Sequence, residues 1–379
     1  MKTADARERV HPFESDTRFF YGAVQKCAAL LLYLLKINDE EFMSNKPSVY
    51  SGGPLVNHED EIKQAHAFAE TGKRNQQVLL VSGMHGNEQN AVLASIGVVS
   101  SCSWSDIDVS YILGLNRNGL LRSVRDFAPV DNKPVTDMNR VFNVLTDKDF
   151  PSPEAMREVI MPAISKSDIV VDVHNSPSCS NMVVIDNNEY AANIVRFCLE
   201  NNIQYYVANR SNTGTLKQYA FRMNKLGFTV ELNGMTIGPF QGKVIASQRE
   251  FLINLLNALN KTPADEIKGL PCEPIPYEKA TREIYNYGGY GLVEFDERVF
   301  AGDMSTELFR KGETFARIID MESHESRELK MPCDGWVIDI DAAVDSKTDS
   351  SIFVVPGKAI CTIQPKINYT DLPVHKAEA

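Results

Sequence analysis

The sequence predicts an α/β fold with a mostly parallel or mixed sheet and helices on both faces, followed by a small all-β domain. Two observations support this class. Between residues 78 and 260, short apolar runs alternate with helix-like stretches, as in sheets whose strands are joined by helices. After Lys261-Thr262-Pro263, helical patterns largely disappear and short β runs with Gly and Pro turns replace them. We therefore divide the chain into a helical preface (1–45), a central α/β domain (46–265) and a β-rich C-terminal domain (270–379).

The predicted strands of the central domain are short runs rich in β-branched and aromatic residues. They are Val78–Val81, Val109–Leu115, Asp168–His174, Val183–Asp186, Tyr205–Ala208 and Phe228–Leu232. Helices are expected from Gln89 onward and over Glu154–Ser167, Tyr190–Asn201, Leu216–Leu226 and Arg249–Asn260. Ser152-Pro153 opens the second of these helices. Gly227 is expected just past the end of the fourth, where glycine is favoured.

The preface is expected to be helical, because Phe20, Ala23, Cys27, Leu31 and Leu34 recur near a 3.6-residue period. A second, polar helix is expected over residues 58–70. Its two histidines lie eight residues apart among acidic residues, which favours a solvated face over a metal site.

The C-terminal domain contains a faint internal repeat. Residues 311–318 resemble residues 356–363, and each copy has a turn glycine leading into an alternating strand. Such an echo is typical of a small β domain built from two similar halves, as in lipoyl-like sandwiches. A carrier function is not expected, since no modifiable lysine stands out in a hairpin.

Composition excludes several function classes. The 379 residues are 43% hydrophobic and 23% charged, as in a soluble globular protein, and the net charge of −11 argues against nucleic acid as the main partner. The longest apolar run, Cys27–Leu35, is far shorter than the roughly 20 residues that a membrane-spanning helix needs. The seven scattered cysteines lack a C-x-x-C pair and the N-terminus lacks a signal-peptide core, so we expect a cytoplasmic protein with reduced thiols and no membrane partner.

Two potential metal ligands follow the first predicted strand. His85 and Glu88 lie three residues apart, just after the break at Ser82-Gly83. Loops that leave the carboxyl ends of buried strands are where α/β sheets usually carry their chemistry. An imidazole and a carboxylate at this spacing can reach one cation, although H-x-x-E alone arises easily by chance.

His174 is the candidate third ligand, because it ends another predicted buried strand. Parallel strands deliver their carboxyl ends to one edge of the sheet. Considered alone, His174 would more simply cap its strand; together with His85 and Glu88, the ligand role is favoured. Asp172 lies two residues earlier on the same side of the strand and can accept a hydrogen bond from the far nitrogen of a ligating histidine.

Glu231 is the candidate general base, since a carboxylate between the apolar residues Val230 and Leu232 needs a reason. Without the other motifs, a strand-end glutamate paired with a surface cation would be the simpler interpretation. Arg140, with Asn139, is a candidate anchor for a substrate carboxylate, which a guanidinium binds in a bidentate manner.

Four motifs together resemble the succinylglutamate desuccinylase/aspartoacylase family, a branch of the zinc-carboxypeptidase-like fold. They are residues 83–88 (GMHGNE), 137–142 (DMNRVF), 172–175 (DVHN) and 230–232 (VEL). The resemblance covers residues 50 to 260, and the family's β-rich C-terminal domain suits residues 270–379. Four motifs in the family's order are far more specific than any one of them.

The resemblance implies one zinc ion held by His85, Glu88 and His174, with Glu231 promoting attack of water on an amide. It also implies that Asn139 and Arg140 hold the carboxylate of the amino-acid part.

Arg125 is our further substrate-binding candidate, with Arg122 a weaker one. Arg125 lies twelve residues before Asp137, whereas the family has its arginine only a few residues before this motif.

The predicted function is therefore a zinc-dependent amidohydrolase, or deacylase, for a small N-acyl amino acid or a related amide. Two alternatives stay open. A metallocarboxypeptidase acting on peptides would use the same ligands and base, and a non-catalytic binding protein could keep the fold without the reaction. The acyl group and the oligomeric state are not predicted, although a homo-oligomer is compatible with the sequence.

Overall fold

The computed structural model describes most of the chain from residue 75 onward. The described residues are 75–116, 119–120, 123–126, 137–142, 160–176, 180–209, 214–234, 242–285, 287–300, 308–340, 353–354 and 356–373. The predicted preface, the predicted polar helix at 58–70 and Arg122 lie outside these ranges. All described residues belong to one compact unit, Tyr50–Ala379.

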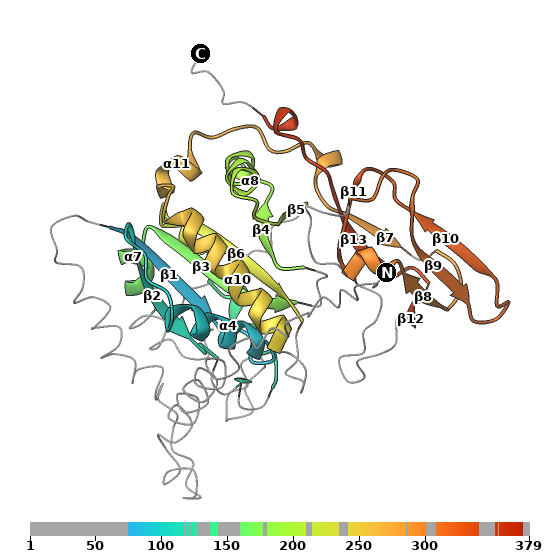
Figure 1. Cartoon of the computed structure of the whole chain (residues 1–379), viewed down its shortest axis with the longest axis horizontal. Helices are drawn as coiled ribbons and strands as arrows, with labels where there is room; N and C mark the ends of the chain where they lie inside the picture. The colour runs from blue at the N-terminus through green and yellow to red at the C-terminus, as the bar shows by residue number, and fades with distance from the viewer. Residues whose placement is uncertain are drawn as a thin grey trace, which may run out of the picture. The chain divides into compact units, whose positions relative to one another are not determined.

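A six-stranded sheet forms the centre of the α/β region (Figure 1). Its strands are β1 (Gln76–Ser82), β2 (Ile107–Leu113), β3 (Ile169–Ser176), β4 (Met182–Asp186), β5 (Tyr205–Ala208) and β6 (Leu226–Asn233). Their order is β2-β1-β3-β6-β4-β5. Strands β2, β1, β3 and β6 pair in parallel, while β4 is antiparallel to β6 and parallel to β5. The predicted α/β class with a mostly parallel or mixed sheet is therefore confirmed.

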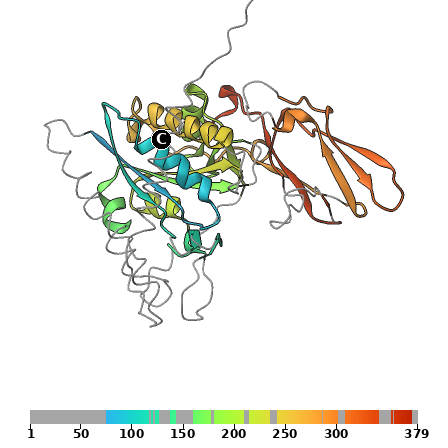
Figure 2. The same ribbon diagram turned by 60° about the horizontal axis from the view of Figure 1, so that its bottom comes forward.

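Helices cover both faces of this sheet. They are α4 (Gln89–Val99), α7 (Met161–Lys166), α8 (Ala191–Glu200), α9 (Leu216–Arg222), α10 (Gly242–Leu259) and the short α11 (Ala264–Lys268). On one face, α4, α8 and α10 pack in a cluster that includes Val78 and Leu80, and α4 and α10 lie side by side (Figure 1, Figure 2). On the other face, α7 and α9 pack in a cluster with Leu79 and Val81. This burial on both faces explains why β1 is a continuous apolar run.

Two helix ends differ from their sequence prediction. Helix α9 ends at Arg222, and the left-handed backbone that follows is that of Asn224, with φ of 60°. Gly227, which was predicted just past this helix, instead lies inside β6. A Cβ at this position would be 2.7 Å from the carbonyl oxygen of Lys217, so a side chain has no room there. The glycine lets the first turn of α9 rest directly on the sheet. Helix α10 begins at Gly242, seven residues before the predicted Arg249.

The C-terminal region consists of two antiparallel sheets, β10-β9-β8-β12 and β11-β13-β7, as its β-rich composition predicts. The strands are β7 (Arg282–Tyr285), β8 (Gly291–Phe295), β9 (Thr314–Asp320), β10 (Ser326–Lys330), β11 (Gly335–Asp339), β12 (Phe353–Val354) and β13 (Ala359–Pro365). Single-turn 3-10 helices are η2 (Met138–Arg140), η4 (Tyr277–Lys279), η5 (Glu297–Phe300) and η6 (Tyr369–Asp371).

The internal repeat corresponds to two equivalent turns. Gly312 and Gly357 both have positive φ, 87° and 73°, and lead into β9 and β13, which belong to different sheets. These sheets have their own hydrophobic cluster. Ile275 and Ala280, however, pack in the cluster of the α/β sheet. The boundaries at 265 and 270 stay predictions.

Within the described ranges, no cysteine forms a disulfide, and no helix is long and apolar enough to span a membrane.

The close contact at Gly227 predicts a measurable stability effect. Gly227→Ala places a methyl group against the backbone of Lys217, and we expect it to lower the free energy of unfolding by about 1–3 kcal/mol, as overpacking does. Gly97→Ala is the matched control, because its Cβ meets only the flexible side chain of Arg249 at 3.2 Å. Within a helix this change is expected to be neutral or stabilising by about 0.5–1 kcal/mol. Equal effects in denaturant unfolding would contradict the close packing of α9 on β6.

Candidate metal centre

The turn after β1 places His85 and Glu88 at the carboxyl edge of the sheet. The chain leaves β1 at Gly83, where a Cβ would lie 2.7 Å from the Cα of Gly114, so the two backbones touch. Glu88 then becomes the N-cap residue of α4. Asn175 on β3 fixes the start of this helix, because its Oδ1 accepts a hydrogen bond of 2.5 Å from the backbone of Ala91. Both His85 and Glu88 are buried.

His174 on β3 meets these two residues. Its Nδ1 lies 3.2 Å from Nδ1 of His85 and 2.9 Å from Oε2 of Glu88, and the other carboxylate oxygen is 2.7 Å from Nδ1 of His85. The potential ligand atoms of all three residues lie within 4.8 Å of one another. The two rings and one carboxylate thus converge on a single point at the sheet edge.

Carboxylates hold the far side of both imidazole rings. Nε2 of His174 lies 2.9 Å from Oδ2 of Asp172, and Nε2 of His85 lies 3.0 Å from Oδ1 of Asp137. With a cation at the shared point, each carboxylate would accept the Nε2 proton of its ring and leave Nδ1 as the lone-pair donor toward the ion. Asp172 was predicted from the sequence. Asp137 was not, although it opens the motif at residues 137–142.

These acids create a negative potential at the rings. Burial lowers the pKa of His85, but its hydrogen bonds with Asp137 and Glu88 outweigh burial and raise it overall. Burial likewise lowers the pKa of His174, and the charges of Asp172 and Glu88 raise it well above its ordinary value. For Glu88, burial raises the pKa, but the charge and hydrogen bond of His174, together with those of His85, hold it at about 2. A cluster that favours positive charge this strongly suits a cation.

The arrangement fits a tetrahedral divalent ion. Ligand nitrogens about 2.05 Å from a tetrahedral zinc are about 3.3 Å apart. The two Nδ1 atoms are 3.2 Å apart, and the Glu88 oxygens lie slightly closer to the rings. Three protein ligands leave a fourth position for water or substrate, as in catalytic zinc sites.

Glu231 lies beside this cluster on β6. It pairs in register with His174 and lines the same cavity. The residue is half-buried, and its buried Oε2 has no hydrogen-bond partner among the described residues. Burial raises the pKa of Glu231 to about 7, although the charge of His174 opposes the rise. A bound cation would shift this balance toward the carboxylate.

Asn139 and Arg140 come from η2, where Asp137 caps the turn by accepting from the backbone of Asn139. The Asn139 side chain is used within the protein. Its Nδ2 contacts Oδ2 of Asp172 at 3.1 Å and Nε2 of His174 at 3.0 Å, and its Oδ1 accepts from the backbone of Leu216. Arg140 is exposed, and its Nη1 donates a hydrogen bond to the carbonyl of Asn139 at 2.8 Å, the contact that its guanidinium makes within the described residues.

Arg125 approaches the metal cluster from the outside. Its guanidinium lies 3.3 Å from Glu88 and 3.3 Å from Asp137, with 43% of the side chain exposed. The structure therefore brings Arg125 to the predicted site, where it contacts one candidate ligand and the carboxylate behind another.

A cavity of about 180 Å³ joins these groups. Besides the predicted residues, it is lined by Asn175, Ser176, Val184, Asp186, Tyr206, Ala208, Thr215, Lys217 and Thr229. The Asp186–Lys217 ion pair was missed by the sequence analysis, because these positions form no motif and the two residues meet only through tertiary packing.

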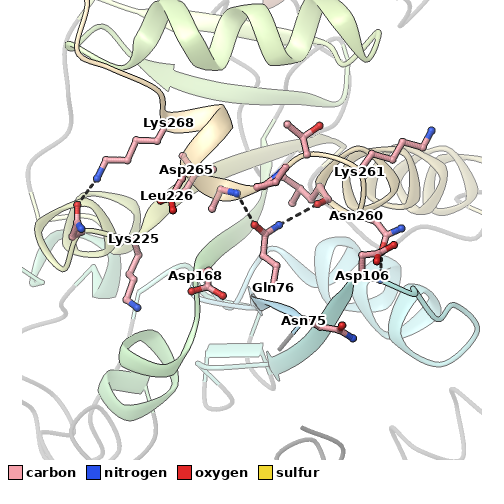
Figure 3. A pocket seen from close by; sticks show the side chains of 15 residues that line it. Asn75, Gln76, Asp106, Asp168, Lys225, Leu226, Asn260, Lys261, Asp265 and Lys268 are labelled. Carbon is pink, nitrogen blue, oxygen red and sulfur yellow. Dashed lines mark hydrogen bonds between the residues drawn. The ribbon is translucent and has the colours of Figure 1, made fainter. Parts of the chain in front are cut away.

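A larger hollow of about 850 Å³ lies at the opposite, amino edge of the sheet (Figure 3). Its lining includes Gln76, Asp168 and Lys268 and contains no histidine or cysteine. Gln76 is bound to the backbone of Leu259, and Lys268 to Asn224. The candidate metal ligands and Glu231 line the smaller cavity instead.

Comparison with known proteins identifies a family for the α/β region. Residues 74–259 match the family model of the succinylglutamate desuccinylase/aspartoacylase catalytic domain. This match contains every predicted site residue. No protein with a curated description matches the chain.

Several solved structures share the fold. The chain is 17% identical to the product-bound ectoine utilization protein EutE (DoeB) from Ruegeria pomeroyi, with a TM-score of 0.50 over 77% of this chain and 86% of that one. It is 16% identical to a succinylglutamate desuccinylase from Silicibacter sp. TM1040, with a TM-score of 0.50 over 76% of this chain and 85% of that one. It is also 16% identical to an aspartoacylase family protein from Mesorhizobium loti, with a TM-score of 0.51 over 78% of this chain and 87% of that one. At such identities the likeness shows the fold alone.

The carboxylates behind the rings predict how metal affinity responds to mutation. Asp172→Asn keeps the size of the side chain but removes the charge that orients His174, and we expect divalent-metal affinity to fall about 10–100-fold. Competition with a chelator measures this affinity. Asp296→Asn is the control, since Asp296 pairs with Arg298 outside the cluster. Unchanged affinity in Asp172→Asn would contradict the orienting role.

Proposed function

Because the chain belongs, through residues 74–259, to the succinylglutamate desuccinylase/aspartoacylase catalytic family, we propose that it is a zinc-dependent amidohydrolase. Its substrate is a small N-acyl amino acid or a related amide, which it deacylates. The observation that supports this most directly is the convergence of His85, Glu88 and His174 beside Glu231, whose Oε2 is buried. A ligand set with an open position next to a carboxylate is the arrangement that metal-assisted hydrolysis needs.

The donor set of two imidazole nitrogens and one carboxylate suits zinc. When bound at His85, Glu88 and His174, zinc would lower the pKa of a water molecule to about 7 and polarise the amide carbonyl. Asp137 and Asp172 keep both rings in the tautomer that presents Nδ1.

Glu231 transfers the proton. As the water oxygen forms a bond to the acyl carbon, Glu231 accepts a proton from that water. It then donates the proton to the amide nitrogen while the carbon–nitrogen bond breaks, which yields an amine and a carboxylic acid that keeps the second proton of the water. A carboxylate beside a bound cation can accept a proton from water and return it to the leaving nitrogen.

Of the two substrate-binding candidates on η2, Arg140 is the stronger. Its guanidinium is exposed at the cavity and keeps free donors in a fork that matches a carboxylate. Asn139 is engaged with Asp172, His174 and the backbone of Leu216. We therefore assign Asn139 the positioning of the site and Arg140 the direct contact with the substrate carboxylate.

The small cavity favours a small substrate over a peptide. A drug-sized ligand typically occupies a pocket of about 300–1,000 Å³, whereas the cavity bounded here is about 180 Å³. A purely binding role leaves the buried, unpartnered oxygen of Glu231 without a purpose, because such a group is costly to bury. Both considerations favour the deacylase.

The test is Glu231→Gln. This variant keeps the shape of the side chain but cannot accept the proton, so we expect zinc content to be unchanged and kcat toward N-acyl amino acids to fall about 10²–10⁴-fold. Elemental analysis and a release assay for the free amine measure the two quantities.

Glu294→Gln, at an exposed position on β8, is the matched control and should retain wild-type turnover. Near-normal turnover in Glu231→Gln would remove Glu231 from the mechanism. Faster cleavage of short peptides than of N-acyl amino acids by the wild-type protein would instead favour the carboxypeptidase.

A further inference from the structure

A buried ion pair closes one side of the candidate active-site cavity. Nζ of Lys217 lies 2.8 Å from Oδ1 of Asp186 and donates a second hydrogen bond to the carbonyl of Val184 at 3.2 Å. The two charged side chains are only 5% and 7% exposed, and both line the cavity. Buried ion pairs contribute little to stability on balance, so their position beside a ligand cavity points to recognition.

The pair lies on the same face of the sheet as Glu231. Met182 on β4 is directly opposite Glu231 on β6, and Asp186 follows four residues later along β4. Alternate residues of a strand share a face, and at about 3.3 Å per residue Asp186 lies about 13 Å further along it. Val184, between them, also lines the cavity. The cavity therefore runs along the sheet from the general base to the ion pair.

The loop before α9 connects the ion pair with the predicted carboxylate anchor. Gly214 packs against the backbone of Arg140, where a Cβ would lie 2.2 Å from the Arg140 carbonyl oxygen. Leu216 donates its backbone N–H to Oδ1 of Asn139 at 2.9 Å, and Lys217 is the next residue. Arg140 and Lys217 line the same cavity, so an amino-acid derivative whose carboxylate is bound by Arg140 can place its side chain at Lys217.

The charges of Lys217 and Asp186, which line one side of the cavity, balance each other. A second carboxylate brought to Lys217 would also approach Asp186 and would leave a net negative charge in a site shielded from water, which is unfavourable. An amide or hydroxyl group can donate to the Asp186 carboxylate and accept from Lys217 without changing the net charge. The ion pair therefore distinguishes an uncharged polar end from an anionic one.

We propose that Asp186 and Lys217 set the substrate specificity of the site, selecting N-acyl amino acids whose side chain ends in an uncharged hydrogen-bonding group and disfavouring acidic ones. This inference rests on the proposed function, since it names the substrate class of the same cavity. Lys217 alone would attract a carboxylate. Asp186 neutralises its charge, so this side of the cavity carries no net charge.

Binding of N-acetyl-L-glutamine and N-acetyl-L-glutamate tests the proposal, because the two probes differ only in amide versus carboxylate. Calorimetry on the full-length, zinc-loaded protein carrying Glu231→Gln, which is expected to bind the probes without hydrolysing them, measures both dissociation constants. With Asp186 and Lys217 intact, we expect this protein to bind the glutamine derivative at least about tenfold more tightly. Asp186→Asn should reduce this preference about tenfold or reverse it, because Lys217 is then unmatched. Lys217→Met should increase the preference, because Asp186 then repels the acidic probe alone.

The opposite directions of the two variants keep the proposal falsifiable if one variant fails to fold. Asp296→Asn, which removes a carboxylate paired with Arg298 in the C-terminal region, is the control and should leave the preference unchanged. Equal or tighter binding of the glutamate derivative, binding of neither probe, or an unchanged preference in the variants would overturn the proposal. Selective binding without any hydrolysis by the wild-type protein would contradict the proposed deacylase activity and leave this specificity intact.

Discussion

The convergence of two imidazole nitrogens is the feature on which the candidate site depends. Nδ1 of His85 and Nδ1 of His174 lie 3.2 Å apart, and each is within hydrogen-bonding distance of a different oxygen of the Glu88 carboxylate. Such a contact persists only because Asp137 and Asp172 hold the opposite nitrogens. Parallel pairing of β1 and β3 brings the two histidines to the same edge of the sheet. The candidate metal site therefore depends on this strand pairing.

The same acidic surroundings explain the state of the neighbouring groups. The carboxylates raise the pKa of both histidines, which marks the point between them as favourable for positive charge. Burial raises the pKa of Glu231 to about 7, although the charge of His174 opposes this rise. Further along the sheet, Lys217 and Asp186 neutralise each other. The cavity thus has a cation-favouring end and a neutral polar end, and these differ in what they can bind.

Much of this could be read from local sequence patterns. Strands such as Val78–Val81 were identifiable because burial on both faces requires continuous apolar residues, and His85, Glu88 and His174 because they follow such strands. Asp172 followed from the two-residue period of a strand. The role of Gly227 was wrong, because its constraint is the backbone of α9 and not a helix end. Asp137, the use of Asn139 and the Lys217–Asp186 pair depend on contacts between distant segments, which a single sequence does not encode locally.

The most direct test of this account is a crystal structure of the protein grown with zinc, with the ion located by anomalous scattering. The account predicts one strong peak, about 2.0–2.1 Å from Nδ1 of His85 and from Nδ1 of His174 and bonded to the carboxylate of Glu88. A peak coordinated through either Nε2, a peak at other residues, or no peak between the two rings would contradict it.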